Sequence, residues 1–172
     1  MIVRKVCLMG AYAVGKTSLV RRFVHQAFDD SYKTTLGVSI DTKLVELNGE
    51  TVKMVIWDFE GQHPSNNESP EFTNLLRSYL NGAAGIILVG DGTRLWTVDS
   101  ALEMHVRYMG INPSTPSVLL INKSDLKDQW KMDKTLPQMP DPFLGCFKTS
   151  ALDGENVEMV FQKLARQMAK SS

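Results

Sequence analysis

The chain has 172 residues, a length that fits one domain with a substantial buried core. Hydrophobic residues make up 43% of it and charged residues 22%, as in an ordinary soluble globular protein. Its 19 basic and 19 acidic side chains balance, so no bulk charge directs the chain to nucleic acid or to an anionic membrane.

The cysteines and the apolar pattern favour a cytoplasmic location. Cys7 and Cys146 fall in or near predicted strands, which suggests buried thiols in a reducing compartment. A signal peptide or an apolar membrane span is not expected, because Arg4 and Lys5 interrupt the first apolar run. Residues 168–172 contain no prenylation box, so peripheral membrane association would need a partner or a tail beyond this sequence.

The first strand, loop and helix carry the strongest chemical signal. Residues 2–9 form an apolar run typical of a buried strand, and residues 18–25 show helical spacing. Between them the sequence reads GAYAVGKT, a phosphate-binding loop or P-loop. Gly10 and Gly15 permit a turn whose N–H groups point at phosphate oxygens, and the helix adds its dipole. Lys16 can reach the β- and γ-phosphates, and the Thr17 hydroxyl can ligate Mg²⁺.

Strands and helices alternate along the rest of the chain, apart from one hairpin. Strands are expected at residues 38–47 and 52–57, with Asn48 and Gly49 forming the two-residue turn between them. Residues 25–37 before the hairpin are expected to form a loop. Further strands are expected at residues 83–89, 117–121 and 145–148, and helices at 71–80, 97–109 and 155–169. Prolines limit any helix within residues 127–144 to a short one.

This order predicts an α/β fold of the P-loop NTPase type. We expect a doubly wound sheet of six strands, mostly parallel, with one antiparallel edge strand and helices on both faces. The apolar side of the helix at residues 97–109 is expected to include Val98, Ala101, His105 and Val106. The polar clusters all follow strand C-termini, and one ligand site at that edge of the sheet would use them together.

A second phosphate-site element follows the strand at residues 52–57. Asp58 would hold Mg²⁺ from the strand end, while Gly61 would let its N–H approach the γ-phosphate. A strand-terminating turn explains these two residues about as well in isolation. Beside a P-loop, the phosphate-site interpretation is favoured.

Asn122, Lys123 and Asp125 indicate which base is bound. A carboxylate in the base plane can accept two hydrogen bonds from guanine, whereas adenine offers no such donor pair. Lys123 can lay its aliphatic stem along the base, and Asn122 can link this loop to the P-loop. A polar turn is the alternative for an isolated tetrapeptide, but its register after a P-loop favours guanine recognition.

Five motifs in order resemble those of a small GTPase of the Ras superfamily, most of all its Rab branch, over nearly the whole chain. They lie at residues 10–17, 35–37, 57–62, 122–125 and 149–151. The resemblance implies one GTPase domain over residues 1–172 that binds GTP or GDP with Mg²⁺ and hydrolyses GTP. It also implies an effector, an exchange factor and a GTPase-activating protein as partners at the switch regions.

The resemblance assigns roles to individual residues. Thr35 would join Thr17 and Asp58 at Mg²⁺ and sense the γ-phosphate. Gln62 would position the attacking water, so Gln62, Lys16 and Thr35 form the expected catalytic set. The expected nucleotide-binding residues are Ala13, Val14, Gly15, Lys16, Thr17, Ser18, Phe28, Tyr32, Thr35, Gly61, Asn122, Lys123, Asp125, Leu126, Ser150, Ala151 and Leu152.

The chain also departs from the family pattern. Tyr12 stands where relatives place a small residue beside the γ-phosphate, and Phe59 and Glu60 replace a threonine–alanine pair. The segment from Gln62 to Tyr79 is several residues longer than usual, and no arginine lies within residues 25–35 to assist hydrolysis. We therefore expect slow intrinsic hydrolysis. Two alternatives stay open: a GTP-binding module with little or no useful hydrolysis that acts as a protein-interaction scaffold, and a P-loop kinase for a small metabolite, which would not need residues 122–125.

Overall fold

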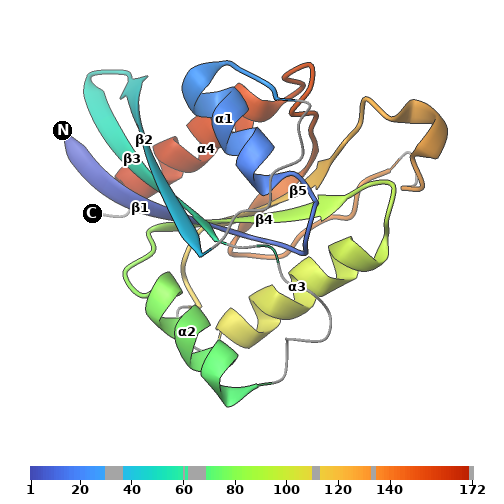
Figure 1. Ribbon diagram of the computed structural model, residues 1–172. Helices are drawn as coiled ribbons and strands as arrows, with labels where there is room; N and C mark the ends of the chain where they lie inside the picture. The colour runs from blue at the N-terminus through green and yellow to red at the C-terminus, as the bar shows by residue number, and fades with distance from the viewer. Residues whose placement is uncertain (30–36, 60, 62–68, 110–112, 133–134, 171–172) are drawn as a thin grey trace.

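The structure is a computed structural model that describes residues 1–29, 37–59, 61, 69–109, 113–132 and 135–170. Within these residues the elements run in the following order (Figure 1): β1 (Ile2–Met9), α1 (Lys16–His25), β2 (Val38–Leu47), β3 (Glu50–Phe59), α2 (Pro70–Leu80), β4 (Gly85–Asp91), α3 (Trp96–Met109), β5 (Ser117–Asn122), the 3₁₀ helix η2 (Lys127–Gln129), β6 (Phe143–Lys148) and α4 (Val157–Lys170).

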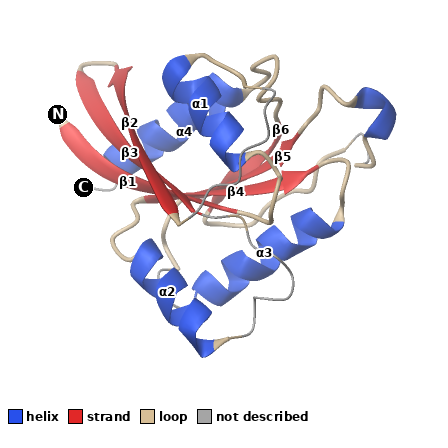
Figure 2. Ribbon diagram, viewed as in Figure 1, coloured by secondary structure: helices blue, strands red, loops and turns tan. Residues whose placement is uncertain are grey.

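The strands form one six-stranded sheet in the order β2-β3-β1-β4-β5-β6. All neighbours pair in parallel except β2 and β3, which are antiparallel and place β2 at the edge. Helices α1 and α4 cover one face of this sheet, and α2 and α3 cover the other (Figure 2). The doubly wound α/β fold predicted from the sequence is therefore confirmed.

The side chains of β1 show how the two layers are filled. Val6 and Leu8 point into a core shared with α1 and α4, whereas Cys7 and Met9 point into a core shared with α2 and α3. Because helices cover both faces, β4 and β5 are buried along their whole length. This double burial explains why both strands read as continuous apolar runs rather than alternating ones.

Local sequence explains the ends of several elements. The Asn48–Gly49 turn joins β2 to β3 as predicted, with Leu47 paired to Glu50 across it and Gly49 at a φ of 85°. Ser69 caps α2, since its hydroxyl accepts a hydrogen bond from the N–H of Phe72.

The structure corrects two expectations. Strand β4 extends to Asp91, which pairs with Asn122 of β5, although the sequence suggested an end at residue 89. Val106 of α3 was expected on the apolar side, yet it is 73% exposed, since a step of one residue from the buried His105 rotates it toward solvent.

A tyrosine links α2 to the centre of the sheet. The Tyr79 hydroxyl forms hydrogen bonds with the carbonyl oxygens of Leu8 and Trp57, at the ends of β1 and β3. The Lys5 ammonium donates to the carbonyl of Tyr79 at 2.6 Å, which anchors the helix C-terminus. These bonds bring α2 against the strand end that carries Asp58.

Candidate functional site

The P-loop connects β1 to α1, and two of its glycines are required by their surroundings. A Cβ on Gly10 would lie 2.3 Å from the carbonyl oxygen of Val89. A Cβ on Gly15 would lie 2.4 Å from Nδ2 of Asn122, and Gly15 has a φ of 97°. The loop can therefore approach β4 and β5 this closely only because both residues lack a side chain.

Lys16 lies buried inside the P-loop. Its ammonium donates to the carbonyl oxygens of Gly10 at 2.9 Å and Ala11 at 3.0 Å. Burial lowers its pKa to about 8, against the opposing effect of the Asp58 carboxylate. Among the described residues, no side chain caps the N-terminus of α1, and a helix N-terminus favours an anion. A cation and a helix N-terminus thus converge where a phosphate would bind.

Thr17 and Asp58 form the second part of the site. The Thr17 hydroxyl donates to Oδ2 of Asp58, while Oδ1 is buried and has no hydrogen-bond partner among the described residues. Burial raises the pKa of Asp58, and only in part do the Thr17 hydroxyl and the Lys16 ammonium counter it. A buried, unsatisfied carboxylate oxygen is costly unless something binds it. With the adjacent hydroxyl it supplies the hard oxygen ligands that Mg²⁺ prefers, so these residues fit that ion.

Gly61 lies directly against the P-loop. A Cβ on this residue would stand 2.7 Å from Cα of Tyr12 and 3.0 Å from Nζ of Lys16. The chain after β3 and the chain after β1 therefore meet at this point, and any larger residue would separate them.

The segment after β5 joins the P-loop through Asn122. Its amide Nδ2 donates to the carbonyl oxygen of Val14 at 2.9 Å, and its Oδ1 accepts from the Thr149 hydroxyl at 3.2 Å. Three residues on, Oδ1 of Asp125 accepts from the Ser150 hydroxyl at 2.7 Å. The structure therefore brings together three separate motifs at the C-terminal ends of β1, β5 and β6.

Further predicted residues lie in the same loops. Ala13 precedes the buried Val14, Ser18 is in the first turn of α1, and the N–H of Leu126 donates to the carbonyl of Lys123 at 3.0 Å. Ala151 is buried, whereas Leu152 is 47% exposed.

Other residues named from the sequence lie near the ends of the described ranges or outside them. Phe28 follows α1 and is 37% exposed. Tyr32, Thr35, Glu60 and Gln62 lie outside the described residues.

Sequence reasoning missed two groups that contact the loops predicted to bind the base. The guanidinium of Arg22 in α1 donates from Nε to the carbonyl of Ala151 at 2.8 Å and from Nη2 to that of Leu152. The buried carboxylate of Asp91 pairs with Lys123 at 2.9 Å and with Arg94 at 3.0 Å. Burial alone would raise the pKa of Asp91, but hydrogen bonds from Lys123 and the neighbouring Thr93 hold it below its usual value. The position of Asp91 at the end of a strand, like that of Asp58, is the sequence feature that could have indicated its role.

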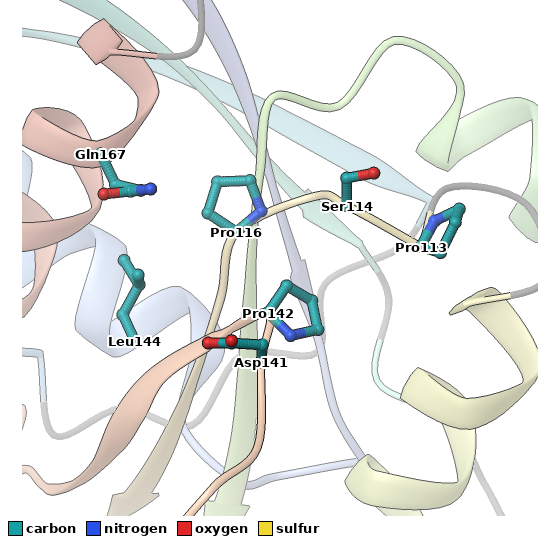
Figure 3. A pocket seen from close by; sticks show the side chains of 7 residues that line it. All are labelled: Pro113, Ser114, Pro116, Asp141, Pro142, Leu144 and Gln167. Carbon is teal, nitrogen blue, oxygen red and sulfur yellow. The ribbon is translucent and has the colours of Figure 1, made fainter.

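A separate cavity of about 450 Å³ lies at the other end of the sheet. Pro116 and Pro142, which immediately precede β5 and β6, line it together with Gln167 of α4 (Figure 3). The loops predicted to bind phosphate and base follow the strand C-termini, so this cavity is not part of the same site.

The doubly wound sheet, the P-loop and the carboxylate at the end of β3 define a P-loop nucleotide-binding protein. The Ras family model matches residues 5–170, which is nearly the whole chain. The chain therefore belongs to the Ras family and is a Rab-like small GTPase.

Named relatives agree with this assignment. The GTP-binding protein YPT1 of Saccharomyces cerevisiae is 37% identical over 97% of this chain and 79% of its own length. The Ras-related protein Rab-7b of Homo sapiens is 34% identical over 94% of this chain and 80% of its own length. The GTP-binding protein YPTM1 of Zea mays is 34% identical over 97% and 78%, respectively. Among the residues that the structure describes, no helix is long and apolar enough to cross a membrane.

Proposed function

We propose that the protein is a guanine-nucleotide switch that binds GTP and GDP with Mg²⁺ and hydrolyses GTP slowly by itself. The observation that carries the proposal is the hydrogen bond from Asn122 to the carbonyl of Val14. It joins the P-loop, or phosphate loop, to the segment after β5 that is proposed to bind the base (the base loop). Relatives named as GTP-binding proteins support the same nucleotide.

Guanine selection is assigned to Asp125. The Ser150 hydroxyl holds its Oδ1 at 2.7 Å, which orients the carboxylate, and Oδ2 and the remaining lone pairs can accept from guanine. The neighbouring Lys123, Leu126, Ala151 and Leu152 complete the proposed base pocket. Binding of fluorescent GDP and ADP tests the assignment: wild type should prefer GDP strongly, and Asp125→Ala should lose that preference. Asp128→Ala, an exposed acidic neighbour, should keep it.

Thr17 and Asp58 would hold Mg²⁺, with Thr35 added from the family resemblance. When bound, the ion neutralises charge on the phosphate oxygens. The protein itself contributes the Lys16 ammonium and the inward N–H groups of the P-loop, which stabilise the charge that develops during phosphoryl transfer. Gln62 is proposed to orient the water.

Slow hydrolysis follows from the position of Tyr12. Gly61, whose N–H would approach the γ-phosphate, stands against the Tyr12 backbone. A tyrosine side chain at this position adds bulk where an attacking water or an arginine from a partner would enter. This observation also favours the second candidate, a GTP-binding module without useful hydrolysis.

Single-turnover hydrolysis separates the two candidates. A slow rate that rises in Tyr12→Gly supports the switch, whereas no hydrolysis by either protein supports the binding module. Hydrolysis by wild type at an ordinary small-GTPase rate without a helper would contradict the proposed slow rate.

The proposed partners are an effector, an exchange factor and a GTPase-activating protein that contact the switch segments. Val38 and Ile40 at the start of β2 are 40% and 53% exposed and follow one of these segments in the sequence. The proposed location is the cytoplasm, with membrane contact only through a partner or a further tail. Pull-downs from a lysate with GTP-loaded and GDP-loaded protein test for partners that distinguish the two forms.

A further inference from the structure

Three successive carbonyl groups of the P-loop accept hydrogen bonds from cationic side chains. The carbonyls of Gly10 and Ala11 accept from Lys16, which belongs to the loop itself. The carbonyl of Tyr12 accepts from Nη2 of Arg94 at 3.1 Å. Arg94 is 82 residues away in the sequence, in the turn between β4 and α3. This side chain has no role in the proposed function above.

Arg94 is held in place by a buried carboxylate. Its Nε donates to Oδ2 of Asp91 at 3.0 Å, and the side chain of Asp91 is 1% exposed. The other oxygen of Asp91 accepts from the N–H and the hydroxyl of Thr93 at 2.9 and 2.7 Å. A planar guanidinium can bridge two acceptors in this fixed way, which a single ammonium group cannot reproduce.

The direction of the Tyr12 carbonyl determines where the next N–H points. In a trans peptide the C=O of one residue and the N–H of the following residue point in opposite directions. With the Tyr12 carbonyl directed at Arg94, the N–H of Ala13 is directed away from Arg94. Ala13 is one of the expected nucleotide-binding residues, and it lies in the loop whose N–H groups are proposed to face phosphate.

Ala13 also needs support for its backbone. Its φ is 59°, in the left-handed region that a residue with a Cβ adopts unfavourably. Such a conformation persists only where the surroundings hold it. The hydrogen bond from Arg94 to the carbonyl just before Ala13 provides that restraint.

We propose that Arg94 is a positioning residue for the phosphate loop: the guanidinium, anchored on Asp91, holds the Tyr12–Ala13 peptide so that the Ala13 N–H faces the bound phosphates. Asp91 also pairs with Lys123, so one carboxylate anchors both the phosphate loop and the base loop. This inference rests on the proposed function, because it assumes that the loop binds a nucleotide.

The test compares Arg94→Gln with wild type by the dissociation rate of fluorescent GDP and by the ³¹P spectrum of bound GDP. Loss of one hydrogen bond of about 1.4 kcal/mol predicts about tenfold faster dissociation. The phosphate resonances should also shift, although Arg94 is not proposed to touch phosphate. Arg94→Lys keeps the positive charge beside Asp91 but lacks the planar guanidinium that bridges two acceptors. It should show a smaller change of the same kind. Arg166→Gln on the exposed side of α4 is the matched control and should change neither measurement.

A second background isolates the positioning role. Glycine adopts positive φ without strain, so in an Ala13→Gly background the Arg94→Gln change should accelerate dissociation by a smaller factor. Unchanged dissociation or unchanged phosphate resonances in Arg94→Gln would overturn the inference, as would an equal factor in both backgrounds. If Arg94→Gln does not fold, the Arg94→Lys variant decides by the same criteria. Failure of wild type to bind GDP would instead overturn the proposed function itself.

Discussion

Asn122 at the end of β5 donates its amide Nδ2 to the carbonyl oxygen of Val14 at 2.9 Å, across 108 residues of sequence. Both groups are buried, and the same amide accepts from Thr149 through Oδ1. This one side chain therefore holds together loops that follow β1, β5 and β6. The proposed site depends on this contact, because it joins the loops on which the site is built.

Replacement of Asn122 by alanine should destabilise both the fold and nucleotide binding. The change leaves the Val14 carbonyl and the Thr149 hydroxyl without their partner, which costs about 1–3 kcal/mol for buried groups. Urea unfolding of the nucleotide-free protein and GDP titration measure the two effects. Asn74→Ala, at an exposed position of α2, should leave both values near wild type. Equal GDP affinity in Asn122→Ala would contradict the joint site.

Removal of Mg²⁺ should speed the release of nucleotide, and this effect should depend on Asp58. With a chelator, GDP should dissociate from wild type at least about tenfold faster, because the unsatisfied Oδ1 of Asp58 then faces the phosphates without a cation. Asp58→Ala should dissociate GDP at a rate that the chelator no longer changes. Stopped-flow fluorescence measures both rates, and Asp99→Ala in α3 serves as the acidic control. A full chelator response in Asp58→Ala would show that this carboxylate holds no metal.

Arg22 should matter for the base loop, and its neighbour provides a control. Arg22→Ala removes the donors to the carbonyls of Ala151 and Leu152, so GDP dissociation should accelerate by about tenfold for one or two lost charge-assisted bonds. Arg21→Ala removes a surface pair with Asp29, at 3.6 Å, and should have a smaller effect. If both variants released GDP equally fast, the loss of positive charge on α1 would be the cause rather than the loop contacts.

His105 should make the protein less stable in mild acid. The ring is buried, and its Nε2 lies 3.0 Å from the Ser117 hydroxyl oxygen, which itself donates to a backbone carbonyl. Burial lowers the pKa of His105 below the usual 6.5, so the unfolded chain takes up a proton first as the pH falls. The free energy of unfolding should therefore decrease as the pH drops through about 6.5.

Urea unfolding at several pH values measures this dependence. His105→Gln should flatten the part of the curve below about pH 6.5, because the variant has no titrating ring at this position. His25→Gln, which alters an exposed histidine, should keep the wild-type slope. A slope that survives in His105→Gln would assign the acid sensitivity to other groups.

Local patterns in the sequence account for most of the fold. The continuous apolar runs of β4 and β5 predict strands buried on both faces, and Asn48–Gly49 predicts the hairpin, because these signals depend on residues close together in the chain. Strand ends were harder to predict. Pairing of Asp91 with Asn122 extends β4 through a polar residue, and that pairing depends on a neighbour that is distant in sequence.

The residues of the candidate site also fall into those that the sequence could indicate and those that it could not. Motifs whose chemistry is carried by their own residues, such as GAYAVGKT and the segment 122–125, could be recognised directly. Arg22 and Arg94 could not be recognised in this way, because in the sequence each resembles an ordinary surface arginine of a helix or turn. Their roles arise from backbone carbonyls that the fold brings to them.

The sequence by itself determined the class of fold, the family and the identity of the residues proposed to bind phosphate and base, because these features are written in short-range spacing and residue type. Only the tertiary structure decided which further groups hold those residues in place: Arg22 on Ala151 and Arg94 on Tyr12. The physical reason is that each of these bonds ends on a backbone carbonyl. Every residue has one, so no pattern of side chains marks the acceptor before the chain has folded.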